Sequence, residues 1–161
     1  MNIGDTMPDL LGTNADNNEI RLSDFPGKKI ILYFYPKDNT PGCTAEACSM
    51  RDNMAKLEAE GYQVIGVSVD SAESHKKFAA KHELNFPLVA DTDHRLVEQT
   101  GVWGEKSMCG RKYMGTFRTT FIIGADHKIE RIYLPKQIKT KTHAEHILGD
   151  RPPSPPLSHP V

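Results

Sequence analysis

The sequence predicts an α/β fold with a central mixed β-sheet flanked by helices on both faces. Strand-like and helix-like segments alternate between residues 28 and 101, and the strand-like segments are continuously apolar. Two further strand-like segments follow with only three residues between them. Alternating strands and helices are typical of parallel strands joined by right-handed crossovers, whereas a short connection is typical of an antiparallel hairpin.

The strands are expected where β-branched and aromatic residues cluster. Continuous apolar runs indicate strands buried on both faces, and they occupy residues 28–36, 62–70 and 86–91. Pro36 closes the first run. Residues 118–124 and 128–134 then flank the short Ala-Asp-His segment 125–127 and predict the hairpin.

The first helix is expected between the first two strands, over residues 41–60. Apolar residues recur there at spacings of four and three, which places them on one helix face: Cys43, Ala47, Met50, Met54 and Leu57. Thr40 is the candidate N-cap, Pro41 occupies the first helical position, and Gly61 marks the end.

Shorter helices are expected further along the chain. They fall in residues 71–83, where Ser71 is the candidate N-cap, in residues 93–101, and within residues 139–149. Residues 102–115 are expected to form a long loop. We predict one domain over residues 1–150, followed by a proline-rich tail, residues 151–161, of disordered or polyproline-like character.

Composition narrows the class of protein. The 161-residue chain has 38% hydrophobic residues and a formal net charge of -1, without the basic field that nucleic acid favours. No apolar run approaches the length of about 20 residues that a membrane span needs, and the amino terminus lacks the features of a signal peptide. We therefore expect a cytoplasmic protein. Three cysteines in that compartment are expected to be catalytic, redox-active or metal-binding rather than structural disulfides.

Cys43 is the strongest candidate for a nucleophile. It falls in the first turn of the expected helix, where unpaired N–H groups and the helix dipole favour an anion, and the thiolate is the nucleophilic form of cysteine. Ligand sites of open α/β sheets also lie at strand-to-helix junctions. The alternative is a small buried side chain on the inner helix face.

The segment around Cys43 resembles the active-site segment of the peroxiredoxins, in which proline, threonine and cysteine follow a fixed spacing. Pro36, Thr40 and Cys43 match those three positions in YPKDNTPGCTAEAC. Cys48, together with GVWGEKS and RTTFIIGADHKIE, is similar to the Q-type branch, the bacterioferritin-comigratory proteins. The resemblance implies a thioredoxin-like fold and thiol-dependent reduction of hydrogen peroxide and organic hydroperoxides. It also implies that Arg118 is an active-site arginine.

Those residue types suit peroxide chemistry. When a thiolate attacks a peroxide oxygen, charge moves to the departing oxygen, and preorganised donors lower the barrier. The donors that we expect are the Arg118 guanidinium, the Thr40 hydroxyl and the Cys43 backbone N–H. Glu46, one turn further on, is expected to order the helix start as a capping-box partner or to hold Arg118.

Cys48 is expected to resolve the sulfenic acid that forms on Cys43. On an intact helix, residues five apart have Cα atoms roughly 8.6 Å apart, whereas a disulfide requires about 4.4 to 6.8 Å. The helix must therefore unwind locally after oxidation. The alternative for Cys48 is a half-exposed helix residue without a redox role.

The remaining candidate residues are expected to be incidental. We interpret Cys109 as a surface thiol, with a back-up resolving or intermolecular role as the alternative, and we expect His143, His146 and the other histidines to be solvated. The family points to thioredoxin or glutaredoxin as reductant, to no metal, flavin or haem, and to no nucleic-acid or membrane partner. We expect a monomer or a weak dimer. A general disulfide oxidoreductase and a redox-responsive binding protein are the competing functions.

Overall fold

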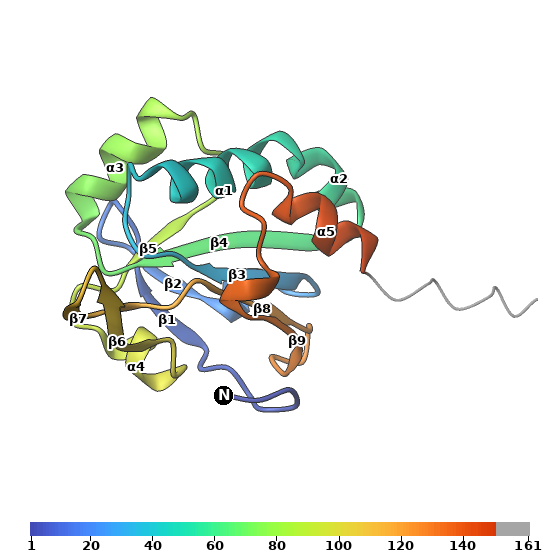
Figure 1. The fold of residues 1–161 in the computed structure, drawn as a ribbon. Helices are drawn as coiled ribbons and strands as arrows, with labels where there is room; N and C mark the ends of the chain where they lie inside the picture. Colours follow the sequence, from blue (N-terminus) through green and yellow to red (C-terminus); the bar gives the residue numbers. More distant parts are fainter. Residues whose placement is uncertain (151–161) are drawn as a thin grey trace, which may run out of the picture.

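A five-stranded mixed sheet forms the centre of the computed structural model, which describes residues 1–150 (Figure 1). β3 lies in the middle, parallel to β4 and antiparallel to β8. Outer strands β5 and β9 pair with β4 in parallel and with β8 in antiparallel orientation. The strands are β3 (Lys29–Phe34), β4 (Tyr62–Ser68), β5 (Leu88–Ala90), β8 (Thr119–Ile123) and β9 (Ile129–Tyr133).

The expected mixed sheet is thus confirmed, and β3 shows why its sequence is continuously apolar. All residues from Ile30 to Phe34 are at most 2% exposed, because β3 has neighbours on both edges and packed layers on both faces. Ile31 and Tyr33 belong to one hydrophobic core, and Ile30, Leu32 and Phe34 belong to the other.

Helices cover both faces of the sheet, as expected, but unevenly. One face carries α1 (Pro41–Asp52), α2 (Met54–Ala59), α3 (Ala72–Lys81) and α5 (His143–Gly149) (Figure 1). The opposite face carries α4 (Arg95–Gln99) and a small hairpin of β1 (Leu10–Thr13) and β2 (Glu19–Arg21). Short 3₁₀ turns occupy Leu22–Asp24 and Pro135–Gln137.

The first helix is interrupted where the apolar spacing predicts continuity. α1 ends at Asp52 and α2 begins at Met54, with Asn53 between them in a non-helical conformation. The Asn53 side chain donates to the carbonyl of Ser49 at 2.9 Å, and its backbone N–H bonds to the same carbonyl. A short polar side chain thus competes for the helical acceptor, although Met54 and Leu57 remain buried on the predicted face.

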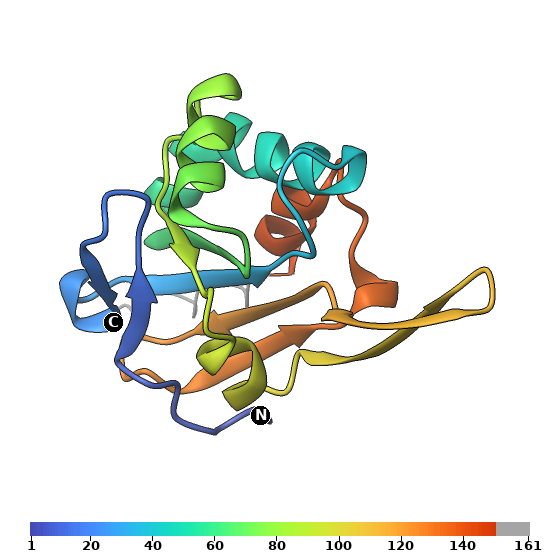
Figure 2. The same ribbon diagram turned by 90° about the vertical axis from the view of Figure 1, so that its left-hand side faces the viewer.

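The prediction of a loop over residues 102–115 is wrong. That segment forms an antiparallel hairpin of β6 (Trp103–Met108) and β7 (Arg111–Thr116), which projects from the body of the molecule in Figure 2. Its two-residue turn, Cys109 and Gly110, has positive φ angles of 52° and 79°, as a type I′ turn requires. Cys109 replaces the asparagine usual at such turns, so the sequence lacks the ordinary hairpin signal.

Two further predictions from the sequence concern the C-terminal tail and membrane spans. The proline-rich tail, residues 151–161, lies outside the described residues. Within residues 1–150, no helix is long and apolar enough to cross a membrane.

Candidate active site

Cys43 lies in the first turn of α1, directly beyond the carboxyl end of the central strand β3. Thr40 precedes the helix with extended dihedral angles, and Pro41 occupies its first position, as predicted. Cys43 belongs to the first four amides of the helix, which have no acceptor within it. Only 1% of the residue is exposed, so a reagent that reaches its sulfur must be small.

Arg118, the residue directly before β8, contacts the candidate nucleophile Cys43. Its Nη2 donates to Cys43 Sγ at 3.3 Å, and its Nη1 donates to Glu46 Oε1 at 2.6 Å. The two acceptors lie 75 and 72 residues from Arg118 in the sequence. The structure thus brings together Cys43, Arg118 and Glu46, which the sequence nominated separately.

Glu46 is the buried anchor of Arg118. Its side chain is 0% exposed, and burial raises the pKa of its carboxyl to about 7, although the charge and hydrogen bond of Arg118 oppose that rise. Of the two alternatives that the sequence left open, holding Arg118 is the observed one. A capping-box role is not observed, because α1 has no side-chain cap hydrogen bond.

A buried histidine from α5 approaches the same carboxyl group. His143 Nε2 lies 4.0 Å from Glu46 Oε2 and 2.9 Å from Thr120 Oγ1. Burial first, and then the positive charges of His146 and Arg118, lower the pKa of His143 to about 4, so the ring is neutral at pH 7. The prediction that His143 is solvated is therefore wrong, because contacts with β8 and α1 cannot be read from α5 alone.

Thr40 is placed differently from the expectation. Its Oγ1 donates to the carbonyl of Lys37 at 2.9 Å, so its hydrogen is committed to the preceding turn and its oxygen is left to accept. Thr40 is thus the N-cap by position only, and in this state it does not supply the donor that the sequence suggested. Pro36 lies in the same turn, between β3 and Thr40.

Cys48 lies one and a half turns beyond Cys43 on the uninterrupted α1 and is partly exposed. Both thiols are free. The structure therefore has the helical geometry for which the Cα separation exceeds the range of a disulfide.

Cys109 and the remaining histidines differ in how exposed their side chains are. Cys109 is exposed at the tip of the β6–β7 hairpin, which agrees with a surface thiol. His146 is partly exposed and pairs with Asp150. His75, by contrast, is 0% exposed and pairs with Asp38 at 2.7 Å, so the expectation of a solvated side chain is wrong for it as well.

Comparison with known proteins agrees with this geometry. Residues 3–132 match the AhpC/TSA family model. The chain is 44% identical to the peroxiredoxin Bcp of Escherichia coli and 42% identical to the peroxiredoxin Bcp of Bacillus subtilis, over 91% of this chain and 92% of each relative.

Solved structures of similar proteins share the fold. A PrxQ mutant of Xylella fastidiosa has a TM-score of 0.83 at 38% identity, covering 92% of this chain and 94% of that one. The bacterioferritin comigratory protein of Xanthomonas campestris, described in terms of alkyl peroxide reduction, has a TM-score of 0.79 at 30% identity, covering 90% and 96%. The thioredoxin-like peroxiredoxin fold is therefore confirmed, and the chain belongs to the AhpC/TSA family as a peroxiredoxin of the Bcp, or Q-type, branch.

Proposed function

We propose that Cys43 is the peroxide-reactive residue of this thiol-dependent peroxidase, with Arg118 as its charged partner. The 3.3 Å contact between Arg118 Nη2 and Cys43 Sγ carries the proposal. A positive guanidinium stabilises the thiolate before the reaction and the departing oxygen during it. Hydrogen peroxide and organic hydroperoxides are the proposed substrates.

The reaction proceeds by oxygen transfer. The Cys43 thiolate attacks one peroxide oxygen, the O–O bond breaks, and the other oxygen leaves as hydroxide or alkoxide and is protonated to water or an alcohol. Cys43 is thereby oxidised to a sulfenic acid. The Arg118 guanidinium and the backbone N–H of Cys43 are the proposed donors to the departing oxygen, whereas Thr40 accepts from the incoming peroxide.

Cys48 is the proposed resolving residue. Its thiol attacks the sulfenic sulfur, a disulfide forms and water leaves. Because α1 holds the two residues about 8.6 Å apart between Cα atoms, the first turns of the helix must unwind before the bond closes. Such unwinding breaks the Arg118 contacts with Cys43 and Glu46, which couples the redox state to the shape of the site.

A dithiol protein, thioredoxin or glutaredoxin, is the proposed reductant, because two electrons must return to the disulfide in each cycle. We propose that the enzyme acts in the cytoplasm, where such dithiols are kept reduced, as a monomer or a weak dimer. The 1% exposure of Cys43 argues against a general disulfide oxidoreductase, since a protein disulfide cannot reach a sulfur that a small peroxide can reach.

The test is to mix reduced protein with one equivalent of hydrogen peroxide and to follow thiol loss and sulfenic acid trapping. Wild type should rapidly lose two thiols. Cys43→Ser should abolish the fast reaction, and Cys48→Ser should lose one thiol and accumulate a trappable sulfenic acid.

Cys109→Ser provides the matched control for removal of a cysteine. Because Cys109 is exposed at a hairpin tip, this variant should turn over like wild type. Slow thiol loss in wild type would reject the peroxidase assignment of Cys43, and an undiminished disulfide yield in Cys48→Ser would reject the resolving role.

A further inference from the structure

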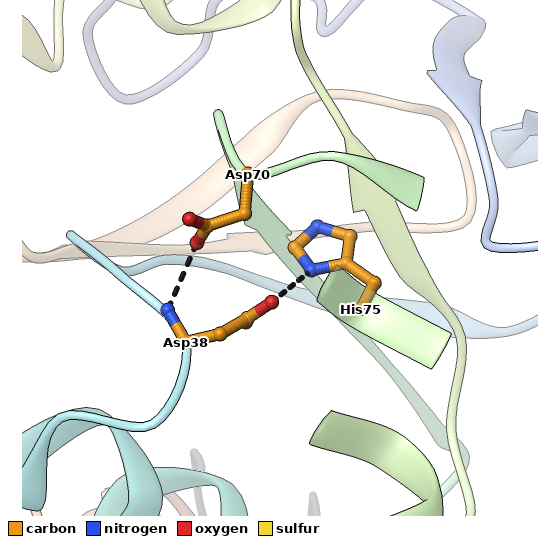
Figure 3. Close-up of side chains that lie close together, drawn as sticks. All are labelled: Asp38, Asp70 and His75. Atoms are coloured by element: carbon orange, nitrogen blue, oxygen red, sulfur yellow. Dashed lines mark hydrogen bonds and ion pairs between the residues drawn. The ribbon is translucent and has the colours of Figure 1, made fainter. Parts of the chain in front are cut away.

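Asp38 is a buried charged residue in the turn that leads from β3 to the nucleophile. It lies two residues after Pro36 and two before Thr40, and it is 4% exposed. Its Oδ1 accepts a 2.6 Å hydrogen bond from the hydroxyl of Tyr35. Its Oδ2 accepts from Ser74 Oγ at 2.8 Å and lies 2.7 Å from His75 Nδ1 (Figure 3).

His75, from α3, is the hydrogen-bonding partner of Asp38. Its side chain is 0% exposed, and its second ring nitrogen, Nε2, lies 3.0 Å from the carbonyl oxygen of Val89 in β5. A carboxylate and a carbonyl only accept, so each ring nitrogen of His75 faces an acceptor, and the Ser68 hydroxyl also lies 3.4 Å from Nε2. The pair is therefore a buried hydrogen-bonded contact that joins the active-site turn to α3 and β5.

The ionised state of the Asp38 carboxyl agrees with its role as an acceptor in these contacts. Burial alone would raise the pKa of its carboxyl, but the hydrogen bond and charge of His75, with the Tyr35 and Ser74 hydroxyls, outweigh burial and lower the pKa. Asp38 is thus ionised at neutral pH.

The main chain of Asp38 is fixed as well. Its backbone N–H donates to Asp70 Oδ2 at 2.9 Å, and the same oxygen accepts from Ser68 Oγ at 2.7 Å (Figure 3). The backbone of this turn residue is therefore held by Asp70 of the β4–α3 connection, and its side chain by Ser74 and His75 of α3. The Asp38 carboxylate has three hydrogen-bond donors, so it is well satisfied despite its burial.

A metal site is the alternative interpretation of this cluster, since Asp38, Asp70 and His75 offer ligand atoms within 4.8 Å of one another. A metal needs a ring nitrogen without a proton. Both nitrogens of His75 are instead directed at acceptors, one in Asp38 and one in Val89. The contacts favour the hydrogen-bonded Asp38–His75 pair over a metal centre.

We propose that His75 is a positioning residue for the peroxidase reaction, and that it fixes through Asp38 the turn that sets Pro36 and Thr40 beside Cys43. His75 touches none of the reacting atoms. Asp38 is separated from Cys43 by only four residues, whereas His75 belongs to α3, so the pair joins the site to α3 and β5. The inference rests on the proposed role of Cys43.

Two substitutions of His75 separate its two contacts. The side-chain amide nitrogen of asparagine is as many bonds from Cβ as Nδ1 of histidine, whereas that of glutamine corresponds to Nε2. His75→Asn thus retains a donor toward Asp38, and His75→Gln retains a donor toward Val89. The readout is the second-order rate of Cys43 oxidation by hydrogen peroxide, in protein shown to be folded by circular dichroism and urea unfolding.

We expect His75→Gln to react about tenfold more slowly than wild type and His75→Asn to recover most of that loss, because small displacements of a catalytic turn lower rates steeply. His146→Gln, at a partly exposed histidine of α5, is the matched control and should react like wild type. Equal rates for folded His75→Asn and His75→Gln would overturn the inference.

Asp38→Asn provides a second variant that keeps the volume of the turn residue and removes its charge. It should show a similar loss of rate in folded protein, and a wild-type rate would also overturn the inference. Failure of the proposed function has a different signature: wild type itself would react slowly, or Cys43→Ser would still react fast.

Discussion

One guanidinium contacts both Cys43 and its acidic neighbour: Arg118 Nη2 lies 3.3 Å from the Cys43 sulfur while Nη1 donates to Glu46 at 2.6 Å. The two contacts use different nitrogens of one rigid planar group, so the bond to Glu46 sets the orientation of the guanidinium over the sulfur. This arrangement accounts for a buried carboxyl group beside the site that is proposed to stabilise negative charge.

Arg118→Lys should therefore lower the rate of Cys43 oxidation, although the substitution retains the positive charge. A lysine has a single nitrogen and cannot keep both geometries, and the loss of one hydrogen bond to a charged group corresponds to about a tenfold lower rate. Stopped-flow kinetics of Cys43 oxidation by peroxide measures this rate in the variant and in wild type. Arg111→Lys, on the exposed strand β7, is the control and should be neutral. A wild-type rate for Arg118→Lys would show that only the charge matters.

Helix α1 is also joined to α5 by one buried hydrogen bond, in which the backbone N–H of Ala144 donates to Ser49 Oγ at 3.2 Å. Ser49 directly follows Cys48, so this bond lies at the end of the segment that is proposed to unwind. Ser49→Ala leaves that N–H without its partner, at a cost of about 1 kcal/mol, or about fivefold in the population of the unwound helix.

The Ser49→Ala prediction is measured by amide exchange and by disulfide formation. Exchange of the α1 amides should become faster, and Cys48 should resolve the sulfenic acid faster than in wild type. Ser107→Ala, on the exposed strand β6, is the control for loss of a serine hydroxyl. Unchanged exchange in α1 would mean that contact with α5 does not limit unwinding.

The sequence predicted well those features that depend on local pattern. The apolar runs predicted the three parallel strands, and the spacing of the apolar residues predicted the buried face from Cys43 to Leu57. The resemblance nominated Arg118, which lies 3.3 Å from the Cys43 sulfur, while the site roles of Pro36, Thr40 and Cys43 stay predictions.

What the sequence did not predict depends on distant partners or on an unusual turn. His75 and His143 are buried because they meet Asp38, 37 residues away, and Thr120, 23 residues away. Most polar side chains are exposed, so the sequence alone predicts a solvated histidine unless such partners are known. The β6–β7 hairpin was missed because Cys109 adopts the left-handed conformation that asparagine or glycine usually signals.

Buried His143 should make the protein sensitive to acid. Its pKa is lowered from 6.5 to about 4, so the unfolded chain binds a proton that the folded protein excludes. The contribution of neutral His143 to the free energy of unfolding amounts to about 3 kcal/mol. It is fully present above pH 6.5 and is lost as the pH falls through about 4. His143→Asn removes this contribution.

Urea unfolding of wild type and of His143→Asn between pH 4 and pH 8 measures the contribution of His143 to the free energy of unfolding. Glu46 contributes the opposite trend, because its pKa is raised to about 7 and its contribution to stability declines as the pH rises from 4.5 through 7. Glu46 is present in both proteins, so the free energy of wild type minus that of His143→Asn should be constant above pH 6.5 and fall below it. A difference that does not vary with pH would reject the prediction.

Gly42 lies in the first turn of α1, and the close approach of Arg118 explains the absence of a side chain there. A Cβ at this position would lie 3.3 Å from Arg118 Nη2 and 3.9 Å from Thr140 Cγ2. Gly42→Ala should raise the stability of α1 by up to about 1 kcal/mol, because alanine is the better helix former.

The same methyl group should lower activity, since it displaces the nitrogen that contacts the Cys43 sulfur. We expect Gly42→Ala to have a higher melting temperature but about a three- to tenfold lower rate of Cys43 oxidation, because a small misplacement of a catalytic group is costly. Gly149→Ala, in α5, is the control, because a Cβ there meets nothing within 4 Å, and it should leave the rate unchanged. A Gly42→Ala protein that gains stability and keeps the wild-type rate would show that Arg118 tolerates displacement, and that the fixed guanidinium is not what limits the attack on peroxide.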